Sequence, residues 1–349
     1  MAGIRVIVTD DSALARSLLR DFLESDGDIT VVGEARNGRE AVDLVHRLQP
    51  DLVTMDLEMP VMGGLAAIEE IMASRPVPIL VVSGVADAHK AFEAVSRGAL
   101  EVIDKPEVGS ASKRDLIAKV RMLSRVKVIT HLRIRAFAPP PPVPAVGPAA
   151  VPAGATAWPR LFAIASSTGG PQVLAAILSR LPADFPCPIV IAQHIAEGFA
   201  PGMAEWLASL CAIKVRLARE DDTPLPGVAY LAPSETNVVI SPGRRLTLPA
   251  RGAGDIYRPS CDLLLGSVAA VCGRASVGVI LTGMGSDGAA GMERIRRAGG
   301  VTLAQDEESS AIFGMNRVAI ERGAIGRVLA ADRIPAEMLM LAHLPVLGG

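Results

Sequence analysis

The chain has 349 residues, of which 50% are apolar and only 3% aromatic, so it is long enough for two domains with aliphatic cores. The 35 basic and 37 acidic residues leave a formal charge of -2, which offers no electrostatic attraction to nucleic acid or anionic lipid. The four cysteines form no CxxC pair and predict neither a zinc site nor a disulfide framework. We therefore expect a cytoplasmic protein with no nucleic-acid partner and no direct membrane insertion.

The N-terminal half alternates short β-branched runs with amphipathic segments. The predicted strands are Ile4–Thr9, Ile29–Val32, Leu52–Met55, Ile79–Val82 and Leu100–Ile103. The predicted helices are Leu14–Leu23, Glu40–Leu48, Leu65–Ala73, Ala88–Arg97 and Asp115–Leu123. This alternation predicts an α/β fold with a parallel sheet and helices on both faces.

A proline-rich segment separates the two halves. Residues 136–159 contain eight prolines, which cannot donate to helix or sheet ladders and favour an extended conformation. These prolines also exclude a membrane-spanning helix there. We predict a first domain at 1–135, a Pro/Ala-rich linker at 136–159 and a second domain at 160–349.

The second half again alternates strands with helices. Its predicted strands are Leu161–Ala165, Ile189–Ala192, Val277–Leu281 and Val301–Ala304. Its predicted helices are Pro171–Leu181, Met203–Leu210, Cys261–Cys272 and Ala289–Ala298. Short β-rich runs between Val215 and Leu248 predict antiparallel hairpins instead of crossovers. The result is a second parallel sheet interrupted by a β excursion.

Charged and hydroxyl residues follow the predicted strands of the first half. Asp10 and Asp11 follow the first strand, Asp56 the third, Ser83 the fourth and Lys105 the fifth. Ligands collect beyond the carboxyl ends of parallel strands, and three carboxylates there require a hard cation such as Mg²⁺. A carboxylate beside Mg²⁺ is also a candidate nucleophile toward phosphorus. Any one of these aspartates alone would more simply cap a helix, but five matching positions favour the phosphoryl site.

The segment MDLEMPVMGGL around Asp56 and the DKP at Lys105 resemble the receiver domain of bacterial response regulators. The resemblance implies a flavodoxin-like (βα)5 fold with Asp56 as phosphoacceptor. It also implies Mg²⁺ ligands at Asp10, Asp11 and Asp56, a switch hydroxyl at Ser83 and a phosphoryl contact at Lys105.

The strand Leu161–Ala165 leads into SSTGG and then Pro171, which predicts a tight strand-to-helix turn. Ser167 in this turn is a candidate nucleophile, although a phosphate cradle or a simple turn would use the same residues. A serine needs a base, and His194 follows the next strand, whereas His343 lies in an apolar C-terminal segment. A histidine hydrogen-bonded at a helix start is the alternative for His194.

Asp287 lies in a glycine-rich loop after Val277–Leu281 and could orient His194, or it could cap the next helix. Glycines in this loop would let the backbone around Met284 approach a reacting carbonyl and stabilise its oxyanion. The order Ser, His, Asp along the chain differs from the orders in the familiar proteases and α/β hydrolases.

The segments ASSTGG, AQHIAEGF, RPSCD and LTGMGSDGA, together with a receiver and a linker, closely resemble the CheB family of protein-glutamate methylesterases. The resemblance implies a three-layer α/β/α catalytic domain with a mainly parallel sheet and a β-hairpin excursion. It implies a catalytic triad of Ser167, His194 and Asp287, with Thr168 and Met284 near the reacting centre. The role of the matching motif Arg258–Asp262 stays open.

The same resemblance implies hydrolysis of glutamyl methyl esters on the cytoplasmic domains of methyl-accepting chemoreceptors, with glutamine deamidation as a second activity. The receiver would need Mg²⁺ and a histidine kinase of the CheA type as phosphodonor, while the esterase would need no cofactor. A DNA-binding response regulator is disfavoured, because the second half has no basic recognition helix. A receiver-controlled hydrolase of another ester, or an adaptor with an inactive triad, in a non-chemotaxis system remains an alternative.

Overall fold

The computed structural model describes residues 3–106, 112–126, 160–252 and 257–346. Within them the chain forms two compact units. The predicted linker 136–159 lies outside the described residues. The predicted domain boundaries therefore stay a prediction.

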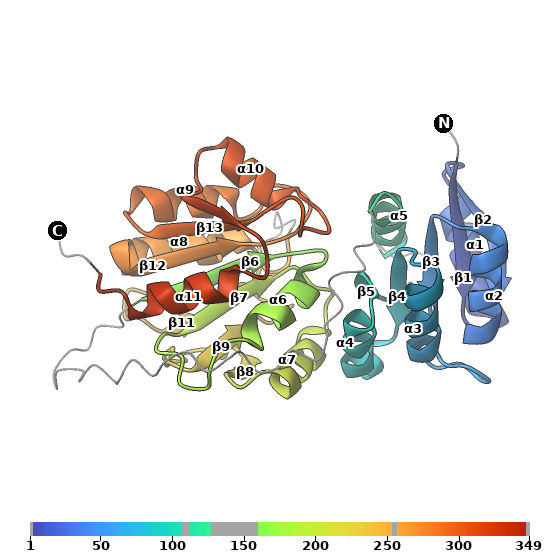
Figure 1. The fold of residues 1–349 in the computed structure, drawn as a ribbon, viewed down its shortest axis with the longest axis horizontal. Coiled ribbons are helices and arrows are strands. Elements are labelled where there is room, and N and C mark those ends of the chain that lie inside the picture. Colours follow the sequence, from blue (N-terminus) through green and yellow to red (C-terminus); the bar gives the residue numbers. More distant parts are fainter. Residues whose placement is uncertain (1–2, 107–111, 127–159, 253–256, 347–349) are drawn as a thin grey trace. The chain divides into compact units, whose positions relative to one another are not determined.

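The N-terminal unit is a five-stranded sheet in the order β2-β1-β3-β4-β5, with every neighbouring pair parallel (Figure 1). Its strands are β1 (Ile4–Thr9), β2 (Ile29–Ala35), β3 (Leu52–Met55), β4 (Ile79–Ser83) and β5 (Glu101–Asp104). Its helices are α1 (Ala13–Glu24), α2 (Gly38–Leu48), α3 (Gly64–Ser74), the short 3-10 helix η1 (Val85–Asp87), α4 (Ala88–Ser96) and α5 (Ser112–Leu123). The predicted receiver fold is confirmed.

Alternation along the strands explains the layers of this unit. Val6 and Val8 share one face of β1 and pack with Leu19 of α1 and Leu116 of α5 in one buried cluster. Helices α2, α3 and α4 contact one another in sequence order. Because all five strands are parallel, their carboxyl ends lie at one edge of the sheet.

The C-terminal unit is a seven-stranded sheet in the order β14-β13-β12-β6-β7-β9-β8, again with every neighbouring pair parallel. Its strands are β6 (Leu161–Ser166), β7 (Ile189–Gln193), β8 (Lys214–Leu217), β9 (Val228–Leu231), β12 (Ser276–Ile280), β13 (Val301–Gln305) and β14 (Arg327–Leu329). Its helices are α6 (Gly170–Leu178), α8 (Cys261–Cys272), the 3-10 helix η3 (Gly273–Ala275), α9 (Ala289–Arg297), α10 (Met315–Glu321) and α11 (Ile334–His343). Helix α7 (Ala200–Leu210) follows β7 in the chain.

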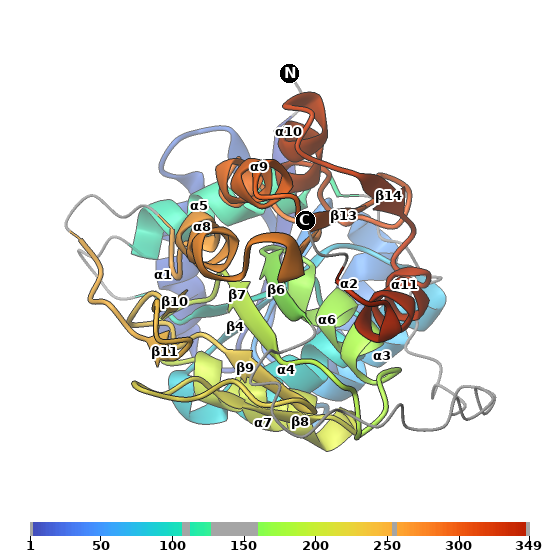
Figure 2. The ribbon, with the colours of Figure 1, turned by 90° about the vertical axis from the view of Figure 1, so that its left-hand side faces the viewer.

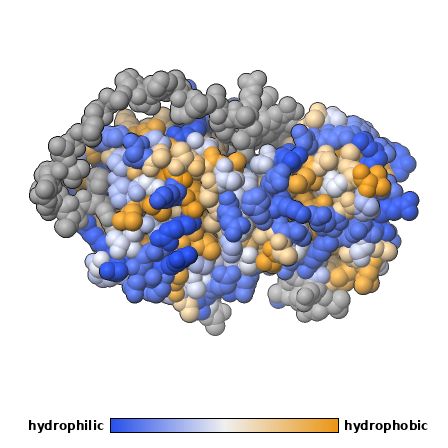
Figure 3. Space-filling model, turned by 90° about the horizontal axis from the view of Figure 1, so that it is seen from below, coloured by the Kyte–Doolittle hydropathy of each residue, from blue (hydrophilic) through white to orange (hydrophobic). Residues whose placement is uncertain are grey.

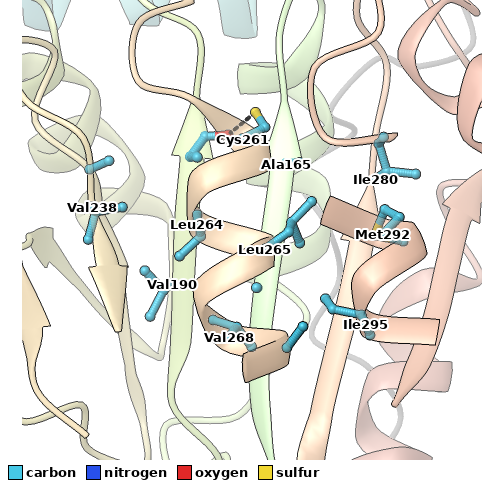
Figure 4. Packing of buried hydrophobic residues seen from close by; sticks show 14 of the residues in the cluster. Ala165, Val190, Val238, Cys261, Leu264, Leu265, Val268, Ile280, Met292 and Ile295 are labelled. Atoms are coloured by element: carbon cyan, nitrogen blue, oxygen red, sulfur yellow. Dashed lines mark hydrogen bonds between the residues drawn. The ribbon is translucent and has the colours of Figure 1, made fainter. Parts of the chain in front are cut away.

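Helices cover both faces of this sheet and make three layers. Helices α8, α9 and α10 lie on one face, and α6 and α11 lie on the other (Figures 1 and 2). On the first face, Leu264, Leu265 and Val268 of α8 pack with Ala165 of β6 and Val190 of β7 (Figure 4). The predicted three-layer α/β/α arrangement is confirmed.

The expectation of antiparallel hairpins between Val215 and Leu248 is only partly correct. Strands β10 (Val239–Ile240) and β11 (Leu246–Thr247) do form an antiparallel hairpin. Strands β8 and β9, however, pair in parallel and extend the main sheet. All four residues of β9 are buried between its neighbours, as expected for an interior strand of a parallel sheet, and residues 218–227 make the crossover without a helix.

The described helices include none with the length and apolar character needed to cross a membrane. On the face drawn in Figure 3, patches of apolar side chains alternate with polar ones. The exposed apolar side chains include that of Met284, which is 58% exposed.

Candidate functional site

The switch point of the C-terminal sheet brings the predicted residues of the second half together. Strand β6 is followed along the chain by β7 on one side, whereas β12 is followed by β13 on the other. The topological switch point of the sheet therefore lies between β6 and β12, where ligands of parallel sheets commonly bind. Ser167 follows β6 at this edge, and its N–H donates to the carbonyl of Thr282 at 3.0 Å. On the other side, the N–H of His194 after β7 donates to the carbonyl of Ser166 at 2.9 Å.

Glycines shape the backbone around Ser167. Gly169 has φ +76°, a left-handed conformation that disfavours side chains, and precedes the first residue of α6. A Cβ on Gly283, in the loop after β12, would lie 2.6 Å from the Cβ of Ser167. The two loops approach so closely that only glycine fits at Gly283.

His194 and Asp287 are joined directly, from loops that follow different strands. Nε2 of His194 lies 2.8 Å from Oδ2 of Asp287. The aspartate side chain is 3% exposed and the histidine side chain 14%. Asp287 does not cap the helix that follows it, since the N-cap of α9 is Gly288.

The N-terminus of α8 holds the carboxylate of Asp287 in place. The N–H groups of Cys261 and Asp262 donate to Oδ2 at 2.6 Å and to Oδ1 at 2.9 Å. Ser260, the N-cap of α8, donates its hydroxyl to Oδ1 at 3.3 Å. The helix N-terminus therefore stabilises the negative charge that faces His194.

These contacts decide the charge of Asp287. Burial alone would raise the pKa of its carboxyl, but the hydrogen bond from His194 and the N–H groups of Asp262 and Cys261 outweigh burial and lower the pKa. Burial and the nearby charge of Asp287 raise the pKa of Asp262, although the N–H of Gly291 opposes that rise. Asp287 is thus an ionised acceptor that fixes a hydrogen on Nε2.

Two further side chains hold the loop that carries His194. The amide nitrogen of Gln193 donates to the carbonyls of Ser167 and His194, each at 2.8 Å. The ring of Tyr257 stacks on the imidazole, with centroids 5.0 Å apart and planes inclined by 12°. The plane of the imidazole is set by an aromatic face as well as by Asp287.

Ser167 lies beside this pair without bonding to it. The side chain is 8% exposed, and in the part of the chain that the structure describes, no hydrogen bond joins its hydroxyl to His194. Such contacts often form only when substrate binds. Among the same described residues, the N–H groups of Thr168 and Met284 donate to no protein acceptor, so they are available to a ligand.

The N-terminal unit gathers its predicted residues at the carboxyl ends of its strands. Nζ of Lys105 lies 2.9 Å from Asp10 Oδ2 and 3.0 Å from Asp56 Oδ2. Carboxylate oxygens of Asp10, Asp11 and Asp56 lie within 4.8 Å of one another. Ser83, buried at the end of β4, lies opposite Asp104 of β5 in the sheet.

Burial destabilises the ionised form of Asp56 in this carboxylate cluster. It raises the pKa of Asp56, which the charge of Asp10 raises further and the hydrogen bond from Lys105 lowers. Burial would lower the pKa of Lys105, but its bonds to Asp10 and Asp56 raise it instead. One ammonium that contacts two of the three carboxylates leaves uncompensated negative charge, which fits a divalent cation.

The family model described as CheB methylesterase matches residues 162–338, which include every residue of the site beside β6 and β12. The model described as response regulator receiver domain matches residues 6–121. The chain belongs to the CheB methylesterase family. The predicted CheB-type enzyme with a response regulator receiver is thereby confirmed.

Several known proteins are similar to this chain. The protein-glutamate methylesterase/protein-glutamine glutaminase 3 of Paramagnetospirillum magneticum is 55% identical over 96% of this chain and 95% of that protein. A relative in Anaeromyxobacter dehalogenans, protein-glutamate methylesterase/protein-glutamine glutaminase 2, is 43% identical over 97% of each chain. The crystal structure of the Thermotoga maritima CheB methylesterase catalytic domain is 34% identical, with a TM-score of 0.51, and covers 52% of this chain and 98% of that one.

In this CheB-type chain, sequence patterns missed several residues that support the site. Arg258–Asp262 was noted as a motif without a role, and in the structure Ser260, Cys261 and Asp262 hold Asp287. The start of this helix is predicted correctly at Cys261, but the sequence pattern does not show that its first N–H groups contact Asp287. Tyr257 and Gln193 carry no local signal, because their contacts are made only in the folded chain.

Proposed function

We propose that this chain is a phosphorylation-activated protein-glutamate methylesterase, and a protein-glutamine deamidase, that uses Ser167, His194 and Asp287. Its substrates would be the cytoplasmic domains of methyl-accepting chemoreceptors. The observation that carries the proposal is the 2.8 Å contact of His194 with an Asp287 clamped at the N-terminus of α8. The names of the two relatives, protein-glutamate methylesterase/protein-glutamine glutaminase, support the ester and amide substrates.

The contacts of His194 assign its two nitrogens in this mechanism. Because Nε2 donates to Asp287, Nδ1 is the nitrogen that accepts the hydroxyl proton of Ser167. The serine oxygen bonds to the γ-carbonyl carbon, and the N–H groups of Thr168 and Met284 would stabilise the oxyanion. Methanol, or ammonia in deamidation, leaves with the proton from Nδ1. Water then hydrolyses the acyl-serine bond, which restores Ser167 and leaves a glutamate side chain on the substrate protein.

Regulation belongs to the receiver in this proposal. Asp56 accepts a phosphoryl group from a histidine kinase of the CheA type, Lys105 and Ser83 contact the phosphoryl oxygens, and Asp10, Asp11 and Asp56 would hold Mg²⁺. The ion supplies charge neutralisation for phosphoryl transfer. The unphosphorylated receiver inhibits the esterase, and phosphorylation shifts the population to an active state.

The test is methanol release from methylated receptor fragments, measured with the full chain, with and without Mg²⁺ and a small-molecule phosphodonor. Ser167→Ala should lose on the order of 10³-fold or more of the turnover, because triad residues act as a unit. The matched control is Ser179→Ala at the C-cap of α6, since the buried Ser179 hydroxyl has no hydrogen-bond partner among the described residues and no proposed chemical role. Near-normal turnover by Ser167→Ala would reject the nucleophile.

Asp56→Asn tests the regulatory half of the proposal separately. The variant should keep basal turnover and lose its response to the phosphodonor. A response equal to that of the wild type would reject Asp56 as the phosphoacceptor. Methylated fragments that release no methanol with any protein, while a simple ester is hydrolysed, would point to a hydrolase with another substrate.

A further inference from the structure

A buried thiol lies next to the imidazole of the proposed triad. Sγ of Cys261 lies 3.5 Å from Nε2 of His194, and its S–H donates to the carbonyl of Ala192 at 3.4 Å (Figure 4). The esterase mechanism uses only the backbone N–H of Cys261. The donor atoms of His194, Cys261 and Asp287 all lie within 4.8 Å of one another.

The three donor atoms approximate the spacing of a tetrahedral zinc site. With Zn–S of about 2.3 Å and Zn–N or Zn–O of about 2.0 Å, tetrahedral ligands lie about 3.5 Å apart for sulfur and nitrogen and about 3.3 Å for nitrogen and oxygen. The observed distances are 3.5 Å for Cys261 to His194 and 2.8 Å for His194 to Asp287. Of these two pairs, the second must open by about half an ångström. The third pair, Cys261 to Asp287, lies within 4.8 Å.

We propose that His194, Cys261 and Asp287 bind a zinc ion, and that the bound ion inhibits the esterase. A thiolate, an imidazole and a carboxylate are the ligand types that zinc takes, and the soft sulfur disfavours Mg²⁺ and Ca²⁺. Three protein ligands leave the fourth position to water. Only the inhibitory effect rests on the proposed function, because metal binding does not require turnover.

Cysteine spacing alone gave no sign of this site, because its ligands come from three separate segments. Asp287 is already held by N–H groups of α8, so its oxygens are oriented before an ion arrives. His194, 14% exposed, is the ligand that water reaches, while Cys261 has no exposed surface. An ion would therefore enter by way of the imidazole.

Protons move in a defined way when the ion binds. The S–H bond of Cys261 breaks, an S–Zn bond forms, and the proton goes to solvent. The hydrogen on Nε2 of His194 is replaced by the ion, and Nδ1 takes up a proton in exchange with water, so one proton is released for each ion. Nδ1 then has no lone pair to accept the proton of Ser167, which explains the inhibition.

Cobalt absorption tests the site without relying on turnover. The full chain is titrated with Co²⁺, whose bond to a thiolate gives a charge-transfer band in the near ultraviolet. We expect the band in the wild type and its displacement by Zn²⁺. Cys261→Val should remove it, while Cys272→Val at the other end of α8 should keep it. A wild type without a band, or a band that survives in Cys261→Val, would overturn the proposal.

Zinc inhibition tests the consequence in the same proteins. Each variant is compared with itself at buffered free Zn²⁺ concentrations and after addition of a chelator, so changes in basal turnover cancel. Cys261→Val should need at least about tenfold more zinc for half inhibition than wild type or Cys272→Val. Equal sensitivity in Cys261→Val would reject the thiol ligand. If Cys261→Val does not fold, as judged by circular dichroism, Cys261→Ala is measured in its place.

The two readouts also separate this inference from the proposed function. If the wild type hydrolyses no methyl ester, the proposed function fails, while the cobalt band still decides whether the metal site exists. If turnover is normal and the band is absent, the metal site alone fails. Both domains are present in every variant, so metal bound by the receiver affects all of them equally.

Discussion

Oδ2 of Asp287 lies 2.8 Å from Nε2 of His194 and accepts the N–H of Cys261 at 2.6 Å. One oxygen thus connects the imidazole to the first turn of α8. The orientation of His194 depends on where this helix begins, and the start of the helix depends on the charge of Asp287. A change at either residue should affect both folding and turnover.

Asp287→Asn should lower the turnover number on the order of 10⁴-fold, because the amide no longer enforces the tautomer that accepts a proton on Nδ1. It should also destabilise the chain by about 1–3 kcal/mol, since an amide NH₂ group would face N–H donors at the start of α8. Steady-state kinetics and urea unfolding measure the two effects. A variant with unchanged turnover would remove Asp287 from the mechanism.

Asp262→Asn is the matched control, on the same helix turn. Asp262 accepts the N–H of Gly291 at 2.6 Å, and an amide oxygen can accept that hydrogen bond equally well. The side chain does not bond His194. The variant should therefore keep most of its turnover, and a loss as large as that of Asp287→Asn would show that the helix start, and not the carboxylate, is what matters.

Gly283→Ala should displace the backbone that carries Ser167. The added methyl would lie 2.6 Å from the Cβ of Ser167 and 2.4 Å from the sulfur of Met315, so one of the two loops must move. A displacement of about 1 Å at a reacting group costs on the order of 10²-fold in rate. Gly243→Ala, where the nearest heavy atom is 3.8 Å away, is the control and should leave turnover unchanged. Normal kinetics in Gly283→Ala would show that the two loops need not approach so closely.

Local patterns predicted the elements whose ends carry local signals. Both β1 and α8 agree with the prediction at each end, because β1 is a β-branched run and α8 begins after Ser260 and ends before Gly273. Strand β14 was missed, since its three residues are largely exposed and show no alternation. The predicted antiparallel pairing is wrong for β8 and β9, which pair in parallel, because a local β pattern does not reveal the partner of a strand or its direction.

In the candidate site too, local patterns predicted the residues that follow strands and missed those that are held by tertiary contacts. Ser167, His194 and Asp287 are predicted as site residues because each follows an apolar strand, and parallel strands end at one edge of a sheet. The clamp on Asp287 comes from a helix start more than twenty residues away in the chain. The stacking of Tyr257 on His194 likewise depends on tertiary packing, which neither periodicity nor composition encodes.

Tyr257→Leu should reduce the turnover number by about 2- to 10-fold, which corresponds to the 0.5–1.5 kcal/mol of an aromatic pair. The aromatic face fixes the imidazole plane and favours the cationic ring that forms when Ser167 transfers its proton. Tyr257→Phe keeps that face and should restore nearly all the turnover. If Phe is as slow as Leu, the hydroxyl and not the stacked ring is the functional group.

The carboxylate cluster of the receiver gives a prediction about pH. Because burial raises the pKa of folded Asp56 above its unfolded value, the folded chain holds a proton that the unfolded chain has already lost. The free energy of unfolding contributed by this group therefore falls as the pH rises from about 3.8 through the raised pKa. Above that window the cost of a buried, ionised carboxylate is fully present.

Asp56→Asn removes this cost, so in metal-free buffer at neutral pH the receiver should unfold at a higher temperature than in the wild type. The difference should shrink as the pH is lowered toward 3.8.

Added Mg²⁺ should stabilise the wild type and have a smaller effect on the variant, because one proposed ligand is missing. Thermal unfolding of the full chains over a pH series measures both effects, and Asp115→Asn, at an exposed carboxylate of α5, is the control that should keep the wild-type response. A wild type more stable than Asp56→Asn at neutral pH without metal would mean that the bond of Asp56 to Lys105 outweighs burial.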